Sequence, residues 1–160
     1  MNELLVAGGT LTPLSSKTHI TYQLPIIGQL ASLELEFRYS PKVLVDQEAA
    51  QSLIIEAIER YNEPSHAELQ KQQWERYTPL QNLLTLSVDD PNGFRGSAHR
   101  HSPEQKYKIA GLASSPGFIN GELPEGLWRI TISVHCVITP ECSYQLIIRG
   151  GSQLYEMDTV

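Results

Sequence analysis

The sequence predicts a mainly β protein, an antiparallel β-sandwich with an inserted helical hairpin. Most segments alternate apolar and polar residues with a period of two, which is typical of strands with one buried and one solvent-facing side. Turn-forming sequences separate these segments. One interval, at about residues 46–78, follows helical spacing instead. We therefore expect a single sandwich domain over residues 1–160, with the helices inserted at 46–78.

The segments Leu33–Tyr39 and Leu127–Val137 show the alternation most clearly. Each places its apolar residues on one face and its polar residues on the other, as the pleat of a strand requires. In the second segment Trp128 opens the inward face, whereas Arg129 and His135 belong to the outward face. We expect further strands at Leu4–Ala7, Thr18–Leu24, Leu83–Val88, Tyr107–Leu112 and Ser143–Arg149.

Three turn sequences fit this arrangement. They are DDPNG at Asp89–Gly93, SSPG at Ser114–Gly117 and LPEG at Leu123–Gly126. Proline fixes φ and glycine permits positive φ, so each sequence favours a reversal of the chain. We therefore place these segments between strands.

The helical interval has recognisable ends. Asp46 is a suitable N-cap for a first helix that runs to Tyr61. Ser65 and Glu68 have the spacing of a capping box for a second helix, and Pro79 ends it. We expect the pair to cover one sheet edge or one end of the sandwich.

Composition and charge exclude several classes of protein. The chain has 41% hydrophobic and 19% charged residues, which is ordinary for a globular domain. Its net charge of −6 disfavours a nucleic-acid partner. No apolar run reaches the length of a transmembrane helix, and the first residues lack the basic start of a signal peptide. We expect a cytoplasmic protein without a membrane partner, whose tail SQLYEMDTV is an exposed end or a short edge strand.

The two cysteines, Cys136 and Cys142, flank a turn that contains Pro140. A hairpin could place them opposite each other, but a disulfide also requires suitable geometry and an oxidising compartment. We expect free thiols.

The stretch FRGSAHRHSPE carries two histidines, His99 and His101, at the i, i+2 spacing with which many metal sites begin. Zinc requires three or four converging ligands. His135 could supply a third, and Asp89 or Asp90 a carboxylate, which would make the protein a small metal-dependent hydrolase. Exposed loop histidines without a cofactor are the simpler interpretation, and a divalent metal is the alternative.

Arg95 follows a turn and precedes Gly96. It could tie the loop together through hydrogen bonds to Asp89, Asp90 or backbone carbonyls. Alternatively, Arg95 and Arg100 could present guanidinium groups to an anionic ligand or a partner. The candidate binding surface is this loop end, with Arg95, His99, Arg100, His101 and the loop Ser114–Gly121 nearby.

Other chemistries leave weaker signals. The sequence has no GxSxG nucleophile elbow and no phosphate-binding GxxxxGK[ST] loop. A carbohydrate- or peptide-binding sandwich is a further alternative, and it predicts aromatic side chains gathered on one face. Tyr22, Tyr107 and Tyr155 are the candidates for such a face.

Three segments together resemble a known family: LTLSVDDPNGFRGSAHR, IAGLASSPGFINGELPEGLWRITISVH and CSYQLIIRG. They are similar to the amino-terminal β-sandwich of CehA/McbA-type metal-dependent hydrolases of the PHP superfamily. The resemblance covers about Leu33 to Gly150 and implies a jelly-roll-like sandwich. It also implies scaffold roles for Asp90, Pro91, Gly93, Gly96, Pro116, Gly117, Gly121, Pro124, Gly126 and Trp128.

In that family catalysis belongs to a PHP domain that follows the sandwich. Only ten residues follow Gly150 here, so we expect no such domain in this sequence. The resemblance therefore implies a non-catalytic accessory or binding module. Its expected partners are a PHP-type hydrolase subunit supplied in trans, a second copy of itself, or a small ligand.

Overall fold

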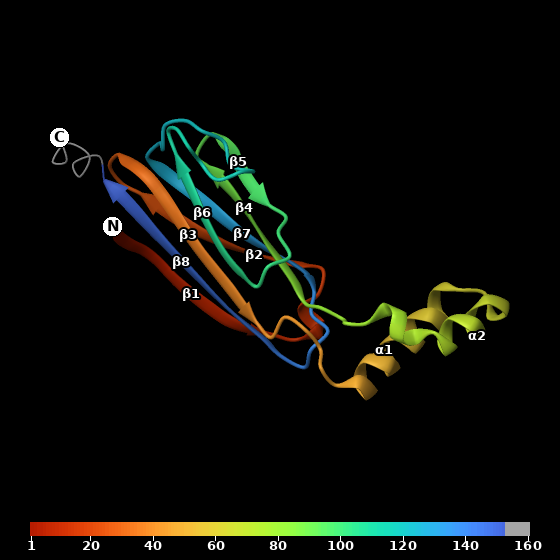
Figure 1. The fold of residues 1–160 in the computed structure, drawn as a ribbon. Helices are drawn as coiled ribbons and strands as arrows, with labels where there is room; N and C mark the ends of the chain where they lie inside the picture. Colours follow the sequence, from red (N-terminus) through yellow and green to blue (C-terminus); the bar gives the residue numbers. More distant parts are fainter. Residues whose placement is uncertain (153–160) are drawn as a thin grey trace.

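The computed structural model describes residues 1–152, which form two four-stranded antiparallel sheets, with a helical segment inserted in the chain between the third and fourth strands (Figure 1). Apart from Ser152, the tail expected to be an exposed end lies outside the described residues. The elements are β1 (Asn2–Leu11), η1 (Pro13–Ser15), β2 (Thr18–Ile26), β3 (Leu30–Ser40), α1 (Gln47–Tyr61), α2 (Pro64–Gln72), η2 (Trp74–Tyr77), β4 (Leu83–Asp90), β5 (Gly93–Ala98), β6 (Glu104–Ala110), β7 (Gly126–Cys136) and β8 (Cys142–Ser152).

The strand order confirms the predicted sandwich. One sheet has the order β1-β8-β3-β6 and the other β2-β7-β4-β5. The pairs β1–β8, β2–β7, β3–β6 and β4–β5 are nested like the two arms of one long hairpin whose tip is the β4–β5 turn. This hairpin is rolled so that β3 also pairs with β8, and β4 with β7. Such a double-sheet arrangement is a jelly roll.

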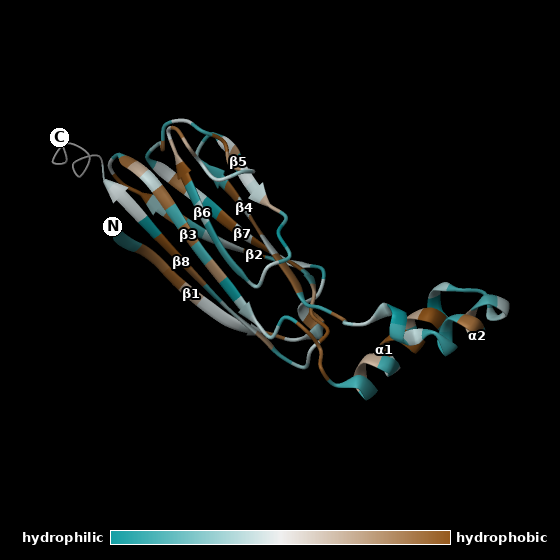
Figure 2. Ribbon diagram, in the orientation of Figure 1, coloured by the Kyte–Doolittle hydropathy of each residue, from teal (hydrophilic) through white to brown (hydrophobic). Residues whose placement is uncertain are grey.

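The core lies between the two sheets and is built from the inward faces of the alternating strands. Phe37, Ile130, Ile132 and Trp128 are all fully buried there. Figure 2 shows the resulting bands of hydrophobic and hydrophilic residues along the strands. The alternation read from the sequence therefore corresponds to inward and outward side chains.

One strand was not expected. β5 lies where the sequence analysis placed only a turn and a loop, and it pairs with β4 across a bulge at Val88/Asp89. Its sequence shows no apolar alternation. Within it, Gly96 has a φ of 148° and lies against the backbone of residues 117–118. A Cβ at this position would come within 2.5 Å of the Gly117 carbonyl oxygen, so only glycine fits.

The helices form an arm (residues 46–78) between β3 of one sheet and β4 of the other. The arm projects beyond one end of the sandwich and does not cover a sheet edge (Figure 1). Asp46 caps α1 as predicted, because its carboxylate accepts a hydrogen bond from Ala49 N at 3.1 Å. The predicted capping box of Ser65 and Glu68 is wrong: the N-cap of α2 is Glu63, and the helix begins at Pro64, whose fixed φ suits the first turn of a helix.

The base of the arm is fixed by Asn82, whose side chain is fully buried. Its amide nitrogen donates to Pro41 O at 2.9 Å and to Thr139 Oγ1 at 2.8 Å. Its amide oxygen accepts from Ile138 N at 2.7 Å, and its backbone N–H donates to Lys42 O at 2.9 Å. These bonds join both ends of the arm to the β7–β8 loop, so the base is held to the sandwich.

Candidate functional site

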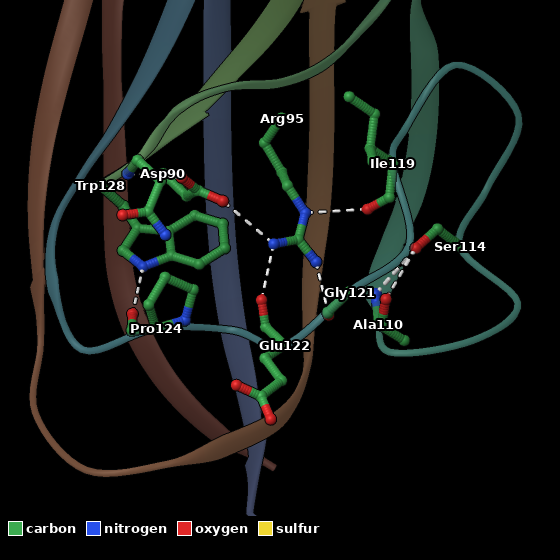
Figure 3. A network of polar contacts seen from close by, with 10 residues as sticks. Asp90, Arg95, Ala110, Ser114, Ile119, Gly121, Glu122, Pro124 and Trp128 are labelled. Atoms are coloured by element: carbon green, nitrogen blue, oxygen red, sulfur yellow. Dashed lines mark hydrogen bonds and ion pairs between the residues drawn. The ribbon is translucent and has the colours of Figure 1, made fainter.

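Arg95 lies at the centre of a network of hydrogen bonds (Figure 3). Its Nε donates to Ile119 O at 2.8 Å, and its Nη2 donates to Gly121 O at 2.6 Å. Its Nη1 donates to Glu122 O at 2.7 Å and to Asp90 Oδ2 at 3.0 Å. Only 6% of the Arg95 side chain is exposed. The guanidinium thus holds the β6–β7 loop against the β4–β5 turn.

This geometry decides between the two roles proposed for Arg95. The structural role is confirmed, with Asp90 and three carbonyls as the acceptors. The structure does not support the ligand-binding role for Arg95, because the guanidinium is buried and four of its five N–H groups already donate to these acceptors. It also lies 5.7 Å from the ring of Trp128, whose Nε1 donates to Pro124 O at 2.9 Å. Arg95 and Trp128 therefore contact each other, and both donate hydrogen bonds to the β6–β7 loop.

The two motifs of the resemblance pack against each other here. A Cβ at Gly126 would come within 2.8 Å of Pro91 Cγ, and one at Gly117 within 2.4 Å of Ser97 O. Both glycines have positive φ, at 130° and 94°. Close approach of the two segments therefore requires glycine in the second motif, which explains their joint presence in one sequence.

The histidine loop lies elsewhere. His99, Arg100 and His101 are exposed in the β5–β6 connection, at the end of the sandwich from which the arm projects. The loop that contacts Arg95 belongs to the opposite end. Arg100 packs over the ring of Tyr107 at 5.3 Å. The predicted surface of Arg95, His99, Arg100 and His101 is therefore not assembled as one site.

The alternative metal site is also not assembled. Within residues 1–152, no three His, Cys, Asp or Glu side chains come together in a way that could hold a metal ion. His135 Nε2 lies 2.8 Å from Thr85 Oγ1 on the outer sheet face, and Asp90 already binds Arg95. The predicted set of His99, His101, His135, Asp89 and Asp90 is therefore wrong as a cluster.

The tyrosines do not form the predicted aromatic face. Tyr107 is 2% exposed, and its hydroxyl donates to Gln105 Oε1 at 2.7 Å. Tyr22 packs against the core, with its hydroxyl 2.6 Å from that of Tyr144. Tyr155 lies outside the described residues. A flat sugar-stacking platform therefore cannot be built from Tyr22 and Tyr107.

The outer face of the β1-β8-β3-β6 sheet is charged. Arg149 Nη1 donates to Glu36 Oε2 at 2.9 Å, and this hydrogen bond holds the pKa of Glu36 below its ordinary value. Lys106 and Lys108 on β6 lie opposite Glu36 and Glu34 on β3. Opposite charges across neighbouring strands are typical of a solvent-facing sheet surface, so we assign this face no ligand.

Both cysteines are free thiols, as predicted. Cys142 is buried and Cys136 half-buried, and burial raises the pKa of each thiol. A raised pKa keeps the thiol protonated at neutral pH, and the thiolate is the reactive form.

We expect Cys142 to resist alkylation by iodoacetamide in the native protein and Cys136 to react slowly. Both should react fully in urea, and the native rates should rise with pH as thiolate forms. Mass spectrometry of the labelled peptides measures this. Equal native and denatured rates at Cys142 would contradict the burial of its thiol.

A surface missed by the sequence analysis lies on the arm. An apolar cavity of about 510 Å³ opens between α1, η2 and the β7–β8 loop. Leu53, Tyr61 and Tyr77 at its margin are 40%, 74% and 49% exposed. Its lining is Leu53, Ile54, Ala57, Ile58, Tyr61, Asn62, Gln70, Tyr77, Leu80 and Ile138. The signal in the sequence is the wide apolar stripe of α1, which exceeds what two short helices can bury.

A larger hollow of about 890 Å³ lies at the other end, between the β2–β3, β6 and β6–β7 segments. Its charged side chains are Lys108, Glu122 and Glu125, and Glu125 accepts a hydrogen bond from Gly28 N across its margin. Every buried side-chain polar atom among the described residues has a partner. Nothing in this hollow therefore points to a ligand.

Comparison with known proteins adds little to this geometry. No family model matches the chain, and no curated protein matches it. A crystal structure of a protein from Sulfurospirillum deleyianum covers 91% of this chain and 98% of its own, with 10% sequence identity and a TM-score of 0.32. A likeness this weak carries no argument. The class of the protein follows from its own strand order: a jelly-roll β-sandwich with a projecting helical arm.

Proposed function

We propose that this protein is a non-catalytic binding module whose helical arm docks onto a partner protein. The apolar cavity on the arm is the observation that carries this proposal. No helix described in residues 1–152 is long and apolar enough to cross a membrane, so a bilayer-spanning helix does not account for the apolar surface. A partner protein is the occupant that we favour.

The arm buries few of its own apolar side chains. Its small core consists of Ile54, Ile58 and Ala67, with Trp74 and Leu80 packed against them. Other large apolar side chains of the arm stay exposed: Leu53, Tyr61, Leu69 and Tyr77. Contiguous apolar surface with tyrosines at its margin is typical of protein–protein contacts. The arm therefore has the composition of an interface.

The charge of the arm indicates the chemistry of the partner. Residues 46–78 carry seven acidic and three basic side chains, a net charge of −4, out of −6 for the whole chain. Such an excess attracts a positively charged partner and accelerates its association. The occupant that fits is an amphipathic helix with apolar residues flanked by lysine or arginine. A PHP-type hydrolase subunit bearing such a helix is the partner that the sequence resemblance suggests.

A direct test measures the binding of a labelled amphipathic helical peptide rich in leucine and lysine, by fluorescence anisotropy. Replacing Leu53 and Tyr61 together by aspartate should weaken this binding roughly tenfold or more, because a charge then has to be desolvated in an apolar site. The isohelical peptide with glutamate in place of lysine should bind weakly to the unmodified protein.

The matched control is Leu14→Asp, which changes a leucine that is 94% exposed and lies in η1, away from the arm. It should bind the peptide as the unmodified protein does. Equal affinity of the Leu53/Tyr61 variant, with an unchanged circular dichroism spectrum, would remove the arm as the binding surface.

A further inference from the structure

The two long sides of the sandwich differ in whether their edge strands are covered by a loop. On one side the loop Ser114–Gly121 closes the edges of β5 and β6. Ser97 N of β5 donates to Gly117 O at 3.1 Å, and Ser115 N donates to Lys108 O of β6 at 2.8 Å. Several outward backbone groups of these two edge strands are thus bonded by the chain itself, which hinders the pairing of a further strand there.

On the other side the edges are β1 and β2, and among residues 1–152 no strand pairs with their outer sides. β2 contains Pro25, which cannot donate a ladder hydrogen bond. From Leu4 to Leu11, β1 has no proline and no charged residue. Natural edge strands normally carry such residues to prevent pairing with another chain. Of these two edges, β1 is therefore the one without a proline, and its register shift against β8 is confined to its start, between Glu3 and Leu5.

The exposure of β1 strengthens this contrast. Val6 is 55% exposed, Leu4 is 36% exposed and the neighbouring Met1 is 57% exposed. Leu5, on the opposite face of the strand, packs against the core. A strand added at this edge would cover the exposed apolar side chains and continue the core-facing surface. The edge thus offers apolar contacts in addition to backbone hydrogen bonds.

We propose that β1 pairs antiparallel with β1 of a second copy of this chain, about a two-fold axis at Ala7. The residue sizes on the two sides of Ala7 are complementary: Leu4, Leu5 and Val6 precede it, and Gly8, Gly9 and Thr10 follow it. Antiparallel self-pairing about Ala7 places each large residue opposite a small one. The β1-β8-β3-β6 sheets of the two copies then form one continuous eight-stranded sheet. The interface is isologous, and its two-fold symmetry is closed.

Charge is compatible with this pairing. Glu3 is the only charged residue of β1, and it lies 3.7 Å from Arg149 of β8 in the same chain. In the proposed register Glu3 lies opposite Leu11 of the other copy, so no two like charges face each other directly. Parallel self-pairing would instead place leucine beside leucine and glycine beside glycine, which packs less evenly. The antiparallel second copy is therefore the occupant that fits.

Sedimentation equilibrium of the full chain over a wide concentration range tests the proposal. The unmodified protein should form a dimer that dissociates on dilution. Val6→Lys should raise the dimer dissociation constant roughly tenfold or more, because it places a lysine on the pairing edge. Gln23→Lys introduces the same charge at an exposed position of β2 and should leave the dissociation constant unchanged.

Hydrogen exchange supplies a second readout. The amides of Leu4–Thr10 that point away from β8 should be protected at high concentration in the unmodified protein and should exchange freely in Val6→Lys. If Val6→Lys loses its folded circular dichroism spectrum, Thr10→Lys on the same edge replaces it, with the same expected effect. A protein that stays monomeric at every concentration, or equal dissociation constants for the β1 and β2 variants, overturns the proposal. The Leu53/Tyr61 aspartate variant should dimerise normally, since this inference is independent of the arm.

Discussion

Replacing Arg95 by alanine should lower the free energy of unfolding by about 3–5 kcal/mol, the range for breaking a buried ion pair by removing one partner. The substitution leaves the Asp90 carboxylate, whose side chain is 9% exposed, without its cation. It also leaves the carbonyls of Ile119, Gly121 and Glu122 without the donors that now satisfy them. Unsatisfied buried polar groups are costly, so we expect the largest effect of any polar substitution in the chain.

Urea denaturation followed by circular dichroism measures this change. Arg100→Ala is the matched control, because that arginine is exposed and only packs over Tyr107. It should change the free energy of unfolding by about 0.5 kcal/mol or less. Arg95→Lys should be intermediate in effect, since an ammonium cannot reach four acceptors arranged around a planar guanidinium. A loss below about 1 kcal/mol for Arg95→Ala would show that the network is not needed for stability.

Several features of the fold could be predicted from the sequence because they depend on local pattern. Leu33–Tyr39 in β3 and the whole of β7 alternate, and this alternation sets which side chains enter the core. Trp128 was placed inward for that reason and is fully buried. Asp46 was expected to cap α1, and capping depends only on neighbouring residues. Local chemistry therefore predicted these elements correctly.

Features that depend on distant partners could not be predicted. β5 has no apolar alternation, and it is held by β4 on one side and by the loop that contains Gly117 on the other. The direction of the arm depends on Asn82, whose bonds join segments more than 40 residues apart. Neither the pairing of β5 nor the bonds of Asn82 produce a periodic pattern in the sequence. Both are therefore seen only in the structure.

The candidate site was predicted only in part, for the same reason. The role of Arg95 as a tie followed from the adjacent turn, so its structural interpretation was correct. Whether His99, His101 and His135 come together depends on which strand ends meet, and the sequence alone does not give this. The jelly-roll order places His135 on an outer sheet face beside Thr85. Closeness in sequence at residues 99–101 thus implied nothing about a third ligand.

Replacing Trp128 by alanine should destabilise the protein by about 3–5 kcal/mol, the range for truncating a buried large aromatic side chain. The ring is fully buried, so its removal leaves a cavity between the sheets. The indole N–H also donates to Pro124 O, and the ring lies beside the Arg95 guanidinium. The substitution should therefore remove hydrophobic burial and also weaken the attachment of the β6–β7 loop.

Trp74→Ala provides the matched control, since Trp74 is the other tryptophan and packs half-buried in the arm. It should cost about 1–2 kcal/mol, in line with partial burial. Because Trp128 and Arg95 touch, the losses of Trp128→Ala and Arg95→Ala should not add in the double variant, whereas those of Trp74→Ala and Arg95→Ala should. Thermal and urea unfolding of the five variants decide this. Additive losses for the Trp128–Arg95 pair would mean that the indole and the guanidinium stabilise the corner independently.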